Sequence, residues 1–539
     1  MHAPFAASLS RSLLRRAWVG AAAALFMTGL VAGQGLDPKI LLQPATTDWP
    51  TYNGDYSGRR FSPLRQINAG DIGDLALAWA FPNVPATIKS TPLVVNGVMY
   101  FTVPEHVFAI DARSGTLIWH YHYAAPGDHI GHRGVAMYRN WIYFTTPDAH
   151  LICLNANDGS VRWNIELADP KQGYFSTMAP LVVDHGTPHV IVGVSGDVTD
   201  IPGYLTSYDP ETGKMQWRWY TEPKPGEPGS ETWPNADARE HGGGMTWMTG
   251  TYDPEAHLLY WGTGNPNPVL AGESRPGDNL YTCSIVALNP ETGKLVWAFQ
   301  PSPHDLHDWD AVETPVLFDA PFHGKPRKLL AQASRNGFFF LLDRLTGEHL
   351  VTAPFIDVNW AQGIDAKGRP IPRPDKAPSP QGSLVEPGSD GATNWMSPSF
   401  DPQTGLFYVV ARRIFSVFYK TNDGKPEGWA GRDRNLWANS TIRALDYQTG
   451  KVVWDHEIGQ GESTAGIMTT AGGLLFSADL NHNLLALDPR SGKTLWHLNM
   501  GNGVDASPMT YELDGRQYYV IGVGGTLYAF TVPEAQAHP

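Results

Sequence analysis

The densest group of ionisable side chains in this sequence lies at residues 304–310, which read HDLHDWD. Two histidines and three aspartates fall within that short segment, among them Asp308 and Asp310. Like charges are costly to crowd together unless a cation compensates them. A pair of carboxylates suits a hard cation, which prefers several oxygen ligands. The segment therefore predicts a functional loop, and the alternative is a solvated polar loop whose aspartates cap turns.

Two further segments carry residues that suit a metal ion or an aromatic cofactor. GTGNP (262–266) contains Asn265, whose side-chain carbonyl is a suitable cation ligand, although Asn-Pro also starts ordinary turns. HGGGMTW (241–247) ends on Trp247, and an indole supplies the flat apolar face that an aromatic cofactor needs. Trp247 does not belong to the repeated turn motif described next, but a core tryptophan remains the alternative reading.

One repeated pattern connects these segments from about residue 70 onward. An apolar strand is followed by Asp/Asn-x-x-[Ser/Thr]-Gly, three residues and Trp, which is typical of a hairpin because glycine accepts the positive φ of its turn. Six clear copies and two weaker ones end, in chain order, at Trp79 (weaker), Trp119, Trp163, Trp217, Trp297, Val351 (weaker), Trp454 and Trp496. The repeats predict an all-β fold, an eight-bladed β-propeller in which each tryptophan packs between neighbouring blades. A β-helix or several stacked sandwiches is the alternative.

The first residues are typical of a targeting segment. Three arginines precede an apolar run at 17–32 that ends in small residues, so residues 1–33 are predicted to be a secretory signal peptide and residues 34–539 a single domain. A permanent N-terminal anchor is the alternative. With the signal removed, we expect no membrane span and a periplasmic or otherwise secreted protein.

Composition excludes several other classes of protein. The chain has 39 Lys+Arg against 53 Asp+Glu, a formal net charge of −14, which argues against nucleic acid as a partner. Its 2 cysteines do not make a disulfide scaffold, and there is no Cys-x-x-Cys-His motif for a fused c-type haem. A Gly-x-Gly-x-x-Gly dinucleotide motif and a Gly-x-Ser-x-Gly hydrolase elbow are also missing from the sequence.

From WPTYNGDYSGRRFSPLRQIN (49–68) to the C-terminal strand, the chain resembles the pyrroloquinoline quinone (PQQ)-dependent, or quinoprotein, alcohol dehydrogenases. The resemblance rests on the repeats and on the segments HDLHDWD, GTGNP, RPGDN, HGGGMTW and SRNG in the expected order. It implies that Asp308 is the catalytic base and that Ca²⁺ or a lanthanide ion is held by Asn265, Asp308 and Asp310. Asp310 matches the extra carboxylate of the lanthanide-using branch of the family.

The resemblance also implies residues that bind the quinone. Trp247 matches the residue that stacks beneath the ring, Arg335 matches the arginine at its carbonyls, and Arg133 matches the arginine at a cofactor carboxylate. Ordinary ion-pairing arginines are the alternative for both. The less specific matches to polar cofactor contacts are Thr146, Ser195 and Asn394. The implied activity is oxidation of a small alcohol to an aldehyde or ketone, with electrons passed to a separate acceptor such as a cytochrome c.

Three departures from the family pattern favour a second hypothesis. Val198 stands where a metal-binding glutamate is expected, and Lys89 where a glutamate contacts the quinone. Gly127 and Asp128 replace the adjacent cysteine pair that often covers the cofactor. The alternative function is a cofactor-free propeller that serves as a binding or assembly scaffold at the cell envelope. A carbohydrate-binding or lyase propeller is supported only by generic aromatic residues.

Overall fold

The computed structural model describes residues 35–125, 131–196, 200–421 and 428–533, all of which belong to one compact unit, 33–539. The predicted signal segment and positions 127, 128 and 198 lie outside these ranges. None of the described helices has both the length and the hydropathy needed to cross a bilayer. The described helices are α1 (Ala236–Glu240), η1 (Pro38–Leu42), η2 (Ile72–Asp74), η3 (Pro170–Gln172), η4 (Ser230–Thr232) and η5 (Pro374–Lys376), the last five being 3-10 helices.

Strands dominate the fold, and most sheets are built from strands that follow one another in the chain. Five four-stranded antiparallel sheets come first. Their strands are β3 (Leu93–Val95), β4 (Val98–Val103), β5 (His106–Asp111), β6 (Leu117–His122); β7 (Ala136–Tyr138), β8 (Trp141–Thr145), β9 (His150–Asn155), β10 (Val161–Glu166); β11 (Leu181–Asp184), β12 (Pro188–Gly193), β13 (Tyr204–Tyr208), β14 (Met215–Tyr220); β15 (Thr251–Asp253), β16 (Leu258–Gly262), β17 (Ile285–Leu288), β18 (Leu295–Phe299); and β19 (Val316–Phe322), β20 (Lys325–Ala333), β21 (Phe338–Asp343), β22 (His349–Pro354).

The described residues form three more sheets of four or five strands, which brings the number of sheets with at least four strands to eight. They also form one two-stranded sheet. The two-stranded sheet is β23 (Ala361–Ile364) with β24 (Pro370–Pro372). The others contain β25 (Ser383–Val385), β26 (Ser399–Asp401), β27 (Leu406–Lys420), β28 (Gly431–Asp446), β29 (Val452–Gln460); β1 (Phe61–Ser62), β30 (Met468–Thr470), β31 (Leu474–Ala478), β32 (Asn483–Leu487), β33 (Thr494–Asn499); and β2 (Ala76–Phe81), β34 (Met509–Leu513), β35 (Arg516–Val523), β36 (Thr526–Thr531).

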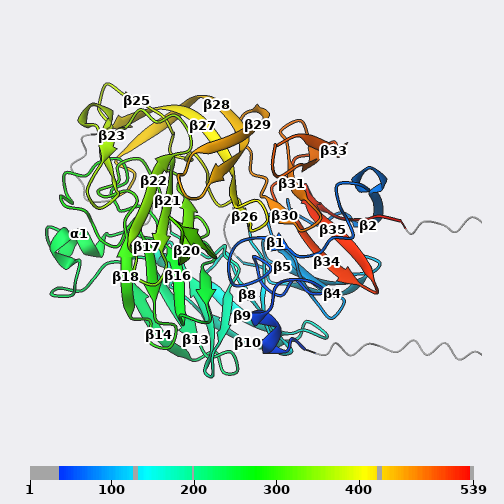
Figure 1. Cartoon of the computed structure of the whole chain (residues 1–539). Helices are drawn as coiled ribbons and strands as arrows, with labels where there is room; N and C mark the ends of the chain where they lie inside the picture. Colours follow the sequence, from blue (N-terminus) through cyan, green and yellow to red (C-terminus); the bar gives the residue numbers. More distant parts are fainter. Residues whose placement is uncertain (1–34, 126–130, 197–199, 422–427, 534–539) are drawn as a thin grey trace, which may run out of the picture. The chain divides into compact units, whose positions relative to one another are not determined.

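The last strands in the chain pair with the first. β2 joins β36 in antiparallel register, with Leu77 opposite Phe530, and β1 pairs in parallel with β30. β33, the fourth strand of its sheet, contacts η2 just before β2. In Figure 1 the red C-terminal strands accordingly lie beside blue N-terminal ones. These sheets form the all-β propeller that the repeat pattern predicts.

Seven of the eight repeats, all except the one that ends at Trp496, dock onto the next repeat through a glycine of its turn. Gly159, with φ +71°, faces the preceding tryptophan so closely that an added Cβ would lie 2.7 Å from the Trp119 ring. The Trp119 Nε1 donates a hydrogen bond to Ala156 O at 2.8 Å. The same glycine-on-indole packing occurs at Gly115–Trp79, Gly213–Trp163, Gly293–Trp217, Gly347–Trp297 and Gly492–Trp454. The weaker repeat that ends at Val351 packs in a similar way, because Gly450 of the next repeat contacts Ala353 and Val351 on β22.

The antiparallel order gives each sheet two different ends. Strands two and four of a sheet finish at the same end, so the connections after them lie together there. We call this the loop end. The Asp-x-x-[Ser/Thr]-Gly turns join strands three and four at the opposite end, which we call the turn end. The loop end therefore gathers connections from every sheet.

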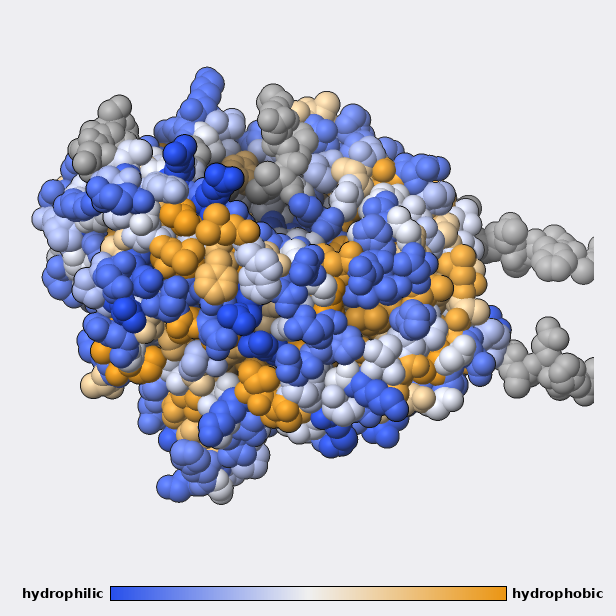
Figure 2. Space-filling model, turned by 90° about the horizontal axis from the view of Figure 1, so that it is seen from above, coloured by the Kyte–Doolittle hydropathy of each residue, from blue (hydrophilic) through white to orange (hydrophobic). Residues whose placement is uncertain are grey.

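The surface and core follow the usual division. Figure 2 shows a face covered mostly by hydrophilic residues, with hydrophobic ones in separate patches. Several exposed apolar side chains belong to fourth strands, among them Leu117, Val296 and Val453. Both cysteines, Cys153 and Cys283, are free and fully buried, as expected of packing residues.

Candidate functional site

The sequence-predicted site residues all come from the loop end. Ser195, Asn265 and Arg335 follow second strands, β12, β16 and β20. The connections that follow fourth strands carry Arg133, Trp247, Asp308, Asp310 and Asn394. Residues far apart in the chain are thereby brought to one end of neighbouring sheets, which is what a shared binding site requires.

Arg335 is the centre of the observed contact network. Its Nη1 lies 3.3 Å from Asp308 Oδ2 and also donates to the Asp308 carbonyl at 2.9 Å. Its Nη2 lies 3.4 Å from Asp310 Oδ2, and its Nε lies 3.9 Å from Glu313 Oε1. Three carboxylates therefore surround one guanidinium whose side chain is only 8% exposed.

The electrostatics of this cluster are those of a buried charge network. Burial lowers the pKa of Arg335, but Asp310, Asp308 and Glu313 raise it more, so the pKa lies above its ordinary value. Burial also raises the pKa of Glu313 well above its ordinary range, against the opposing effect of Arg335. Both carboxylate oxygens of Glu313 are buried and accept no hydrogen bond from the described protein. An additional donor or cation would therefore stabilise the ionised form of Glu313.

Trp247 lies against this cluster from one side. Its Nε1 donates to Asp310 Oδ2 at 2.7 Å, which fixes the orientation of the indole. The guanidinium carbons of Arg133 and Arg335 lie 4.8 and 5.5 Å from the centre of the indole rings. The electron-rich face of an indole attracts cations, so Trp247 helps to hold both guanidinium groups close to its rings.

The glycine run before Trp247 brings its segment onto the Asn265 loop. A Cβ on Gly243, with φ +92°, would lie 2.4 Å from the carbonyl oxygen of Asn265, so only glycine allows this approach. Gly244 N donates to the same carbonyl at 2.8 Å. Asn265 N in turn donates to Asp310 Oδ1 at 2.6 Å, while its side-chain Nδ2 donates to Pro266 O. Asp310 therefore ties the Asn265 and Trp247 loops together.

Asn394 is also part of the network. Its Oδ1 accepts a hydrogen bond from Arg335 Nη2 at 3.2 Å, and its Nδ2 donates to Asp390 O at 3.1 Å. The next residue, Trp395, lies with its ring 5.5 Å from the Arg133 guanidinium. Sequence reasoning missed Trp395, although it adjoins a predicted site residue.

The remaining predicted residues differ in how they relate to this network. Arg133 donates from Nη1 to the Thr177 hydroxyl, a partner that the sequence analysis did not single out. Ser195 is 2% exposed, and its Oγ has no hydrogen-bond partner in the described protein. The hydroxyl of Thr146 donates to Asp148 Oδ1 at 2.5 Å, within its own turn.

Of the departures, only Lys89 falls within the described residues. Its stem packs on Gly131, where an added Cβ would lie 2.7 Å from the lysine Cδ. Gly131 lies two residues before Arg133, so Lys89 borders the loop that carries this arginine. Val198, Gly127 and Asp128 lie outside the described residues.

A cavity of about 220 Å³ adjoins the 304–310 loop. Trp309 and Trp360, with ring centroids 4.6 Å apart, belong to its lining, as does Asp305. Burial raises the pKa of Asp305 to about 6, although the backbone N–H of Trp309 and the Arg275 guanidinium oppose the shift. The rest of its lining comes largely from β24 and the segment after it, and Asp308, Asp310 and Arg335 do not line it.

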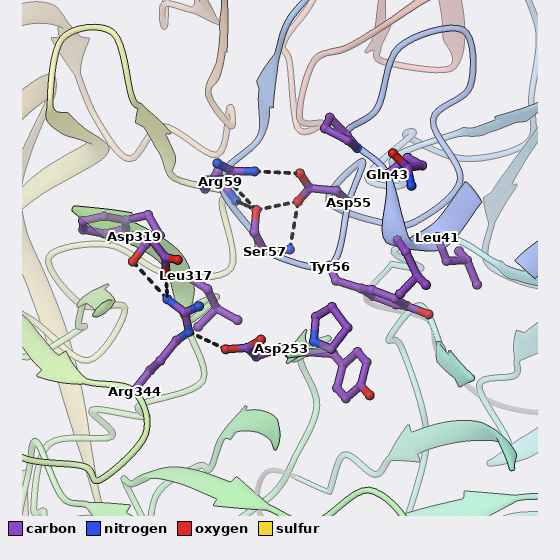
Figure 3. Close-up of a pocket in the computed structure, with 15 residues that line it drawn as sticks. Leu41, Gln43, Asp55, Tyr56, Ser57, Arg59, Asp253, Leu317, Asp319 and Arg344 are labelled. Atoms are coloured by element: carbon purple, nitrogen blue, oxygen red, sulfur yellow. Dashed lines mark hydrogen bonds and ion pairs between the residues drawn. The ribbon is translucent and has the colours of Figure 1, made fainter. Parts of the chain in front are cut away.

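A larger cavity, of about 330 Å³, shares no lining residue with this network. Figure 3 shows its charged side chains already paired. Arg344 contacts Asp253 at 2.6 Å and Asp319 at 2.5 Å, and Arg59 contacts Asp55 at 3.2 Å. Because its arginines are neutralised by its own carboxylates, this cavity offers less unsatisfied polar chemistry than the Arg335 cluster.

The sequence of this chain is similar to that of known proteins over most of its length. Residues 49–364 and 456–519 match the family described as "PQQ: Glucose/ethanol/alcohol dehydrogenase, beta-propeller domain". The quinoprotein alcohol dehydrogenase PedH of Pseudomonas putida is 35% identical over 94% of this chain and 91% of its own length.

Two solved structures show the same arrangement of the chain. The quinohemoprotein alcohol dehydrogenase of Comamonas testosteroni superposes with a TM-score of 0.86 at 33% identity, covering 94% of this chain and 83% of that one. A europium-containing methanol dehydrogenase superposes with a TM-score of 0.83 at 31% identity, covering 92% of this chain and 99% of that one.

Proposed function

This chain belongs to the PQQ-dependent glucose, ethanol and alcohol dehydrogenase family, and on that premise we propose that it is an exported enzyme that oxidises a small alcohol to an aldehyde or ketone. Its membership makes it an oxidoreductase of the quinoprotein class. The observation that carries the proposal is the single contact network of Asn265, Asp308, Asp310, Arg335 and Trp247 at the loop end.

We further propose that the eight larger sheets are the blades of one closed propeller domain, residues 34–539, exported by the signal segment 1–33. The pairing of β2 with β36 and the contact of β33 with η2 support closure, because they join the last repeat to the first. A propeller leaves only short, protected strand edges, which limits the pairing of its strands with other chains. Periplasmic or secreted location follows from the signal.

The residues present fit a quinone cofactor with a hard cation. Asp308, Asp310 and Asn265 supply oxygen atoms of the kind that Ca²⁺ and lanthanide ions bind, and the buried carboxylate of Glu313 lacks hydrogen-bond donors. Trp247 offers an indole face, while Arg335 and Arg133 offer guanidinium groups for carbonyl and carboxylate oxygens. The buried Ser195 hydroxyl has hydrogen-bonding capacity left unused by the described protein. When bound, PQQ with its metal would supply the electron acceptor for hydride and a Lewis acid.

The protein's own residues then have separate tasks. Asp308 accepts the hydroxyl proton of the alcohol as general base, and Arg335 positions it by holding both its carboxylate and its carbonyl oxygen. Trp247, held through its Nε1 by Asp310, covers one face of the site. Asn394 helps to fix Arg335 by accepting a hydrogen bond from its Nη2. We propose a separate acceptor such as a cytochrome c for the electrons, as the name of a related 1-butanol dehydrogenase (cytochrome c) suggests.

Reconstitution and turnover test this proposal. The purified protein is incubated with PQQ and either Ca²⁺ or La³⁺, and dye reduction is followed with a panel of small alcohols. We expect alcohol-dependent dye reduction that requires both PQQ and a metal. The absence of turnover with either metal across the panel would contradict the proposal and favour the cofactor-free scaffold.

A further inference from the structure

A second cluster of ligand side chains lies on the sheet β3–β6, outside the Arg335 network. Three imidazoles and a carboxylate meet where β5 begins and β6 ends, at Glu105, His106, His120 and His122. In the described part of the chain, Glu105, His106 and His122 are the one set of three His, Cys, Asp or Glu side chains whose ligand atoms lie within 4.8 Å of one another. Nothing in the proposed oxidation uses them.

Strand register brings these rings together. His106 pairs directly with His122 across β5 and β6, and Phe108 pairs with His120. Directly opposed side chains on antiparallel strands have Cβ atoms about 5 Å apart. The His106 and His122 rings are stacked, with centroids 4.3 Å apart, and His106 Nδ1 shares a hydrogen bond with His120 Nε2 at 2.8 Å. Positions 120 and 122 lie on the same side of β6 because side chains alternate along a strand.

The turn before β5 adds the carboxylate. Val103 pairs with His106, so Pro104 and Glu105 form a two-residue turn in which Glu105 has φ +67°. That position normally favours glycine or asparagine, so glutamate is held there at some cost in backbone strain. Its Oε1 accepts a hydrogen bond from Ala125 N at 2.6 Å, which orients the carboxylate at the side of the two rings.

We propose that Glu105, His106 and His122 bind a divalent transition-metal ion of the Zn²⁺ class, with His120 as a positioning residue. Two imidazole nitrogens and one carboxylate oxygen form a donor set suited to Zn²⁺ and unlike the all-oxygen sets that Ca²⁺ prefers. The hydrogen bond between His120 and His106 Nδ1 leaves His106 Nε2 as its metal-binding atom. A metal-bound histidine usually donates its second ring N–H to an acceptor, and the unprotonated Nε2 of His120 can be that acceptor for His106.

The site lies at the loop end, since the β4–β5 turn follows a second strand and β6 is a fourth strand. A bound ion would therefore cross-link the β4–β5 turn to the end of β6.

Metal titration of the mature protein tests the inference. Zn²⁺ binding is measured by calorimetry with Ca²⁺ in large excess, so that the Asp308 and Asp310 carboxylates are offered their own cation. We expect one saturable Zn²⁺ per chain that is lost in His106→Ala and in His122→Ala. His120→Ala should weaken binding about tenfold, the usual effect of removing the support of a ligand. Co²⁺ in place of Zn²⁺ should give the intense visible absorption of a four- or five-coordinate site.

His497→Ala is the matched control, because His497 is an exposed histidine on β33, the fourth strand of another sheet. It should leave Zn²⁺ binding unchanged. Absence of saturable binding by the wild-type protein would overturn the inference, as would binding that survives His106→Ala and His122→Ala. The wild-type titration tests the inference by itself, so the test remains valid even if a variant fails to fold. Neither result depends on PQQ, so the outcome is separate from that of the proposed function.

Discussion

The two ends of the sheets differ in how completely their polar groups are satisfied. At the turn end, the indole nitrogens of Trp79, Trp119, Trp217, Trp297 and Trp454 each donate to a backbone carbonyl of the next repeat. Trp163 is an exception, since its Nε1 is buried without a hydrogen-bond partner. At the loop end, Glu313 and Ser195 are buried with side-chain oxygens that accept or donate no hydrogen bond in the described protein.

That difference separates stability from function. The turn-end contacts are local, repeated and apolar, so they stabilise the fold by burying indole surface and satisfying its nitrogen. The loop end concentrates charges whose pKa values are shifted by burial, a pattern that clusters at functional sites. Changes at one end should therefore affect stability, and changes at the other should affect activity.

The largest expected effect on activity is at Asp308. Asp308→Asn keeps the size of the side chain but removes the general base, so we predict that kcat falls about 10²- to 10⁴-fold. Dye-linked turnover of the reconstituted enzyme measures it, with thermal unfolding as the control for folding. Activity within threefold of the wild type would show that Asp308 is not the base.

The opposite pattern is predicted at Trp119. Trp119→Ala removes the indole that covers Gly159 and should lower the free energy of unfolding by about 3–5 kcal/mol. Turnover per folded molecule should stay close to that of the wild type. Denaturant unfolding gives the first quantity, and active-site titration gives the second. A large loss of kcat without loss of stability would contradict the prediction that the turn end determines stability and the loop end determines activity.

The buried carboxyl of Glu313 should make the stability of the protein depend on pH. Its pKa is raised in the folded protein, so its contribution to stability is full below its unfolded pKa and is lost as pH rises through the folded value. Without cofactor and metal, Glu313→Gln should therefore remove a fall in stability that begins near pH 4.5, at about the unfolded pKa, and continues as the pH rises. Unfolding free energies of both proteins across that range measure this, and parallel pH profiles would refute it.

The smallest expected effect on stability is at Ser195. Ser195→Ala removes a buried hydroxyl without a hydrogen-bond partner, so stability should change by no more than about 0.5 kcal/mol, while the affinity for PQQ should fall about tenfold. Ser114→Ala at the turn end, where the hydroxyl donates to Thr116, is the control and should leave PQQ affinity unchanged. If the two variants bind PQQ with equal affinity, Ser195 does not contact the cofactor.

Local sequence signals predicted the fold well. The turn motif predicted that each tryptophan packs between neighbouring blades and identified Val351 as a substitute for the indole, while the pairing of each indole with a glycine of the next repeat came from the structure. Within the candidate site, residue type and segment pattern together singled out Asp310, Trp247 and Arg335, which contact one another in the structure. Glu313, Thr177 and Trp395 were missed because their roles arise from contacts between distant loops, which no local spacing encodes.

The most direct test of the account is the native mass of the purified protein after incubation with PQQ and Ca²⁺ or La³⁺. We predict a complex of one PQQ and one metal ion per chain, with PQQ retention reduced in Asp308→Ala Asp310→Ala, which lacks both carboxylates of the metal loop. A wild-type protein that gains no cofactor mass with either metal would contradict the assignment of the loop end as a quinone site.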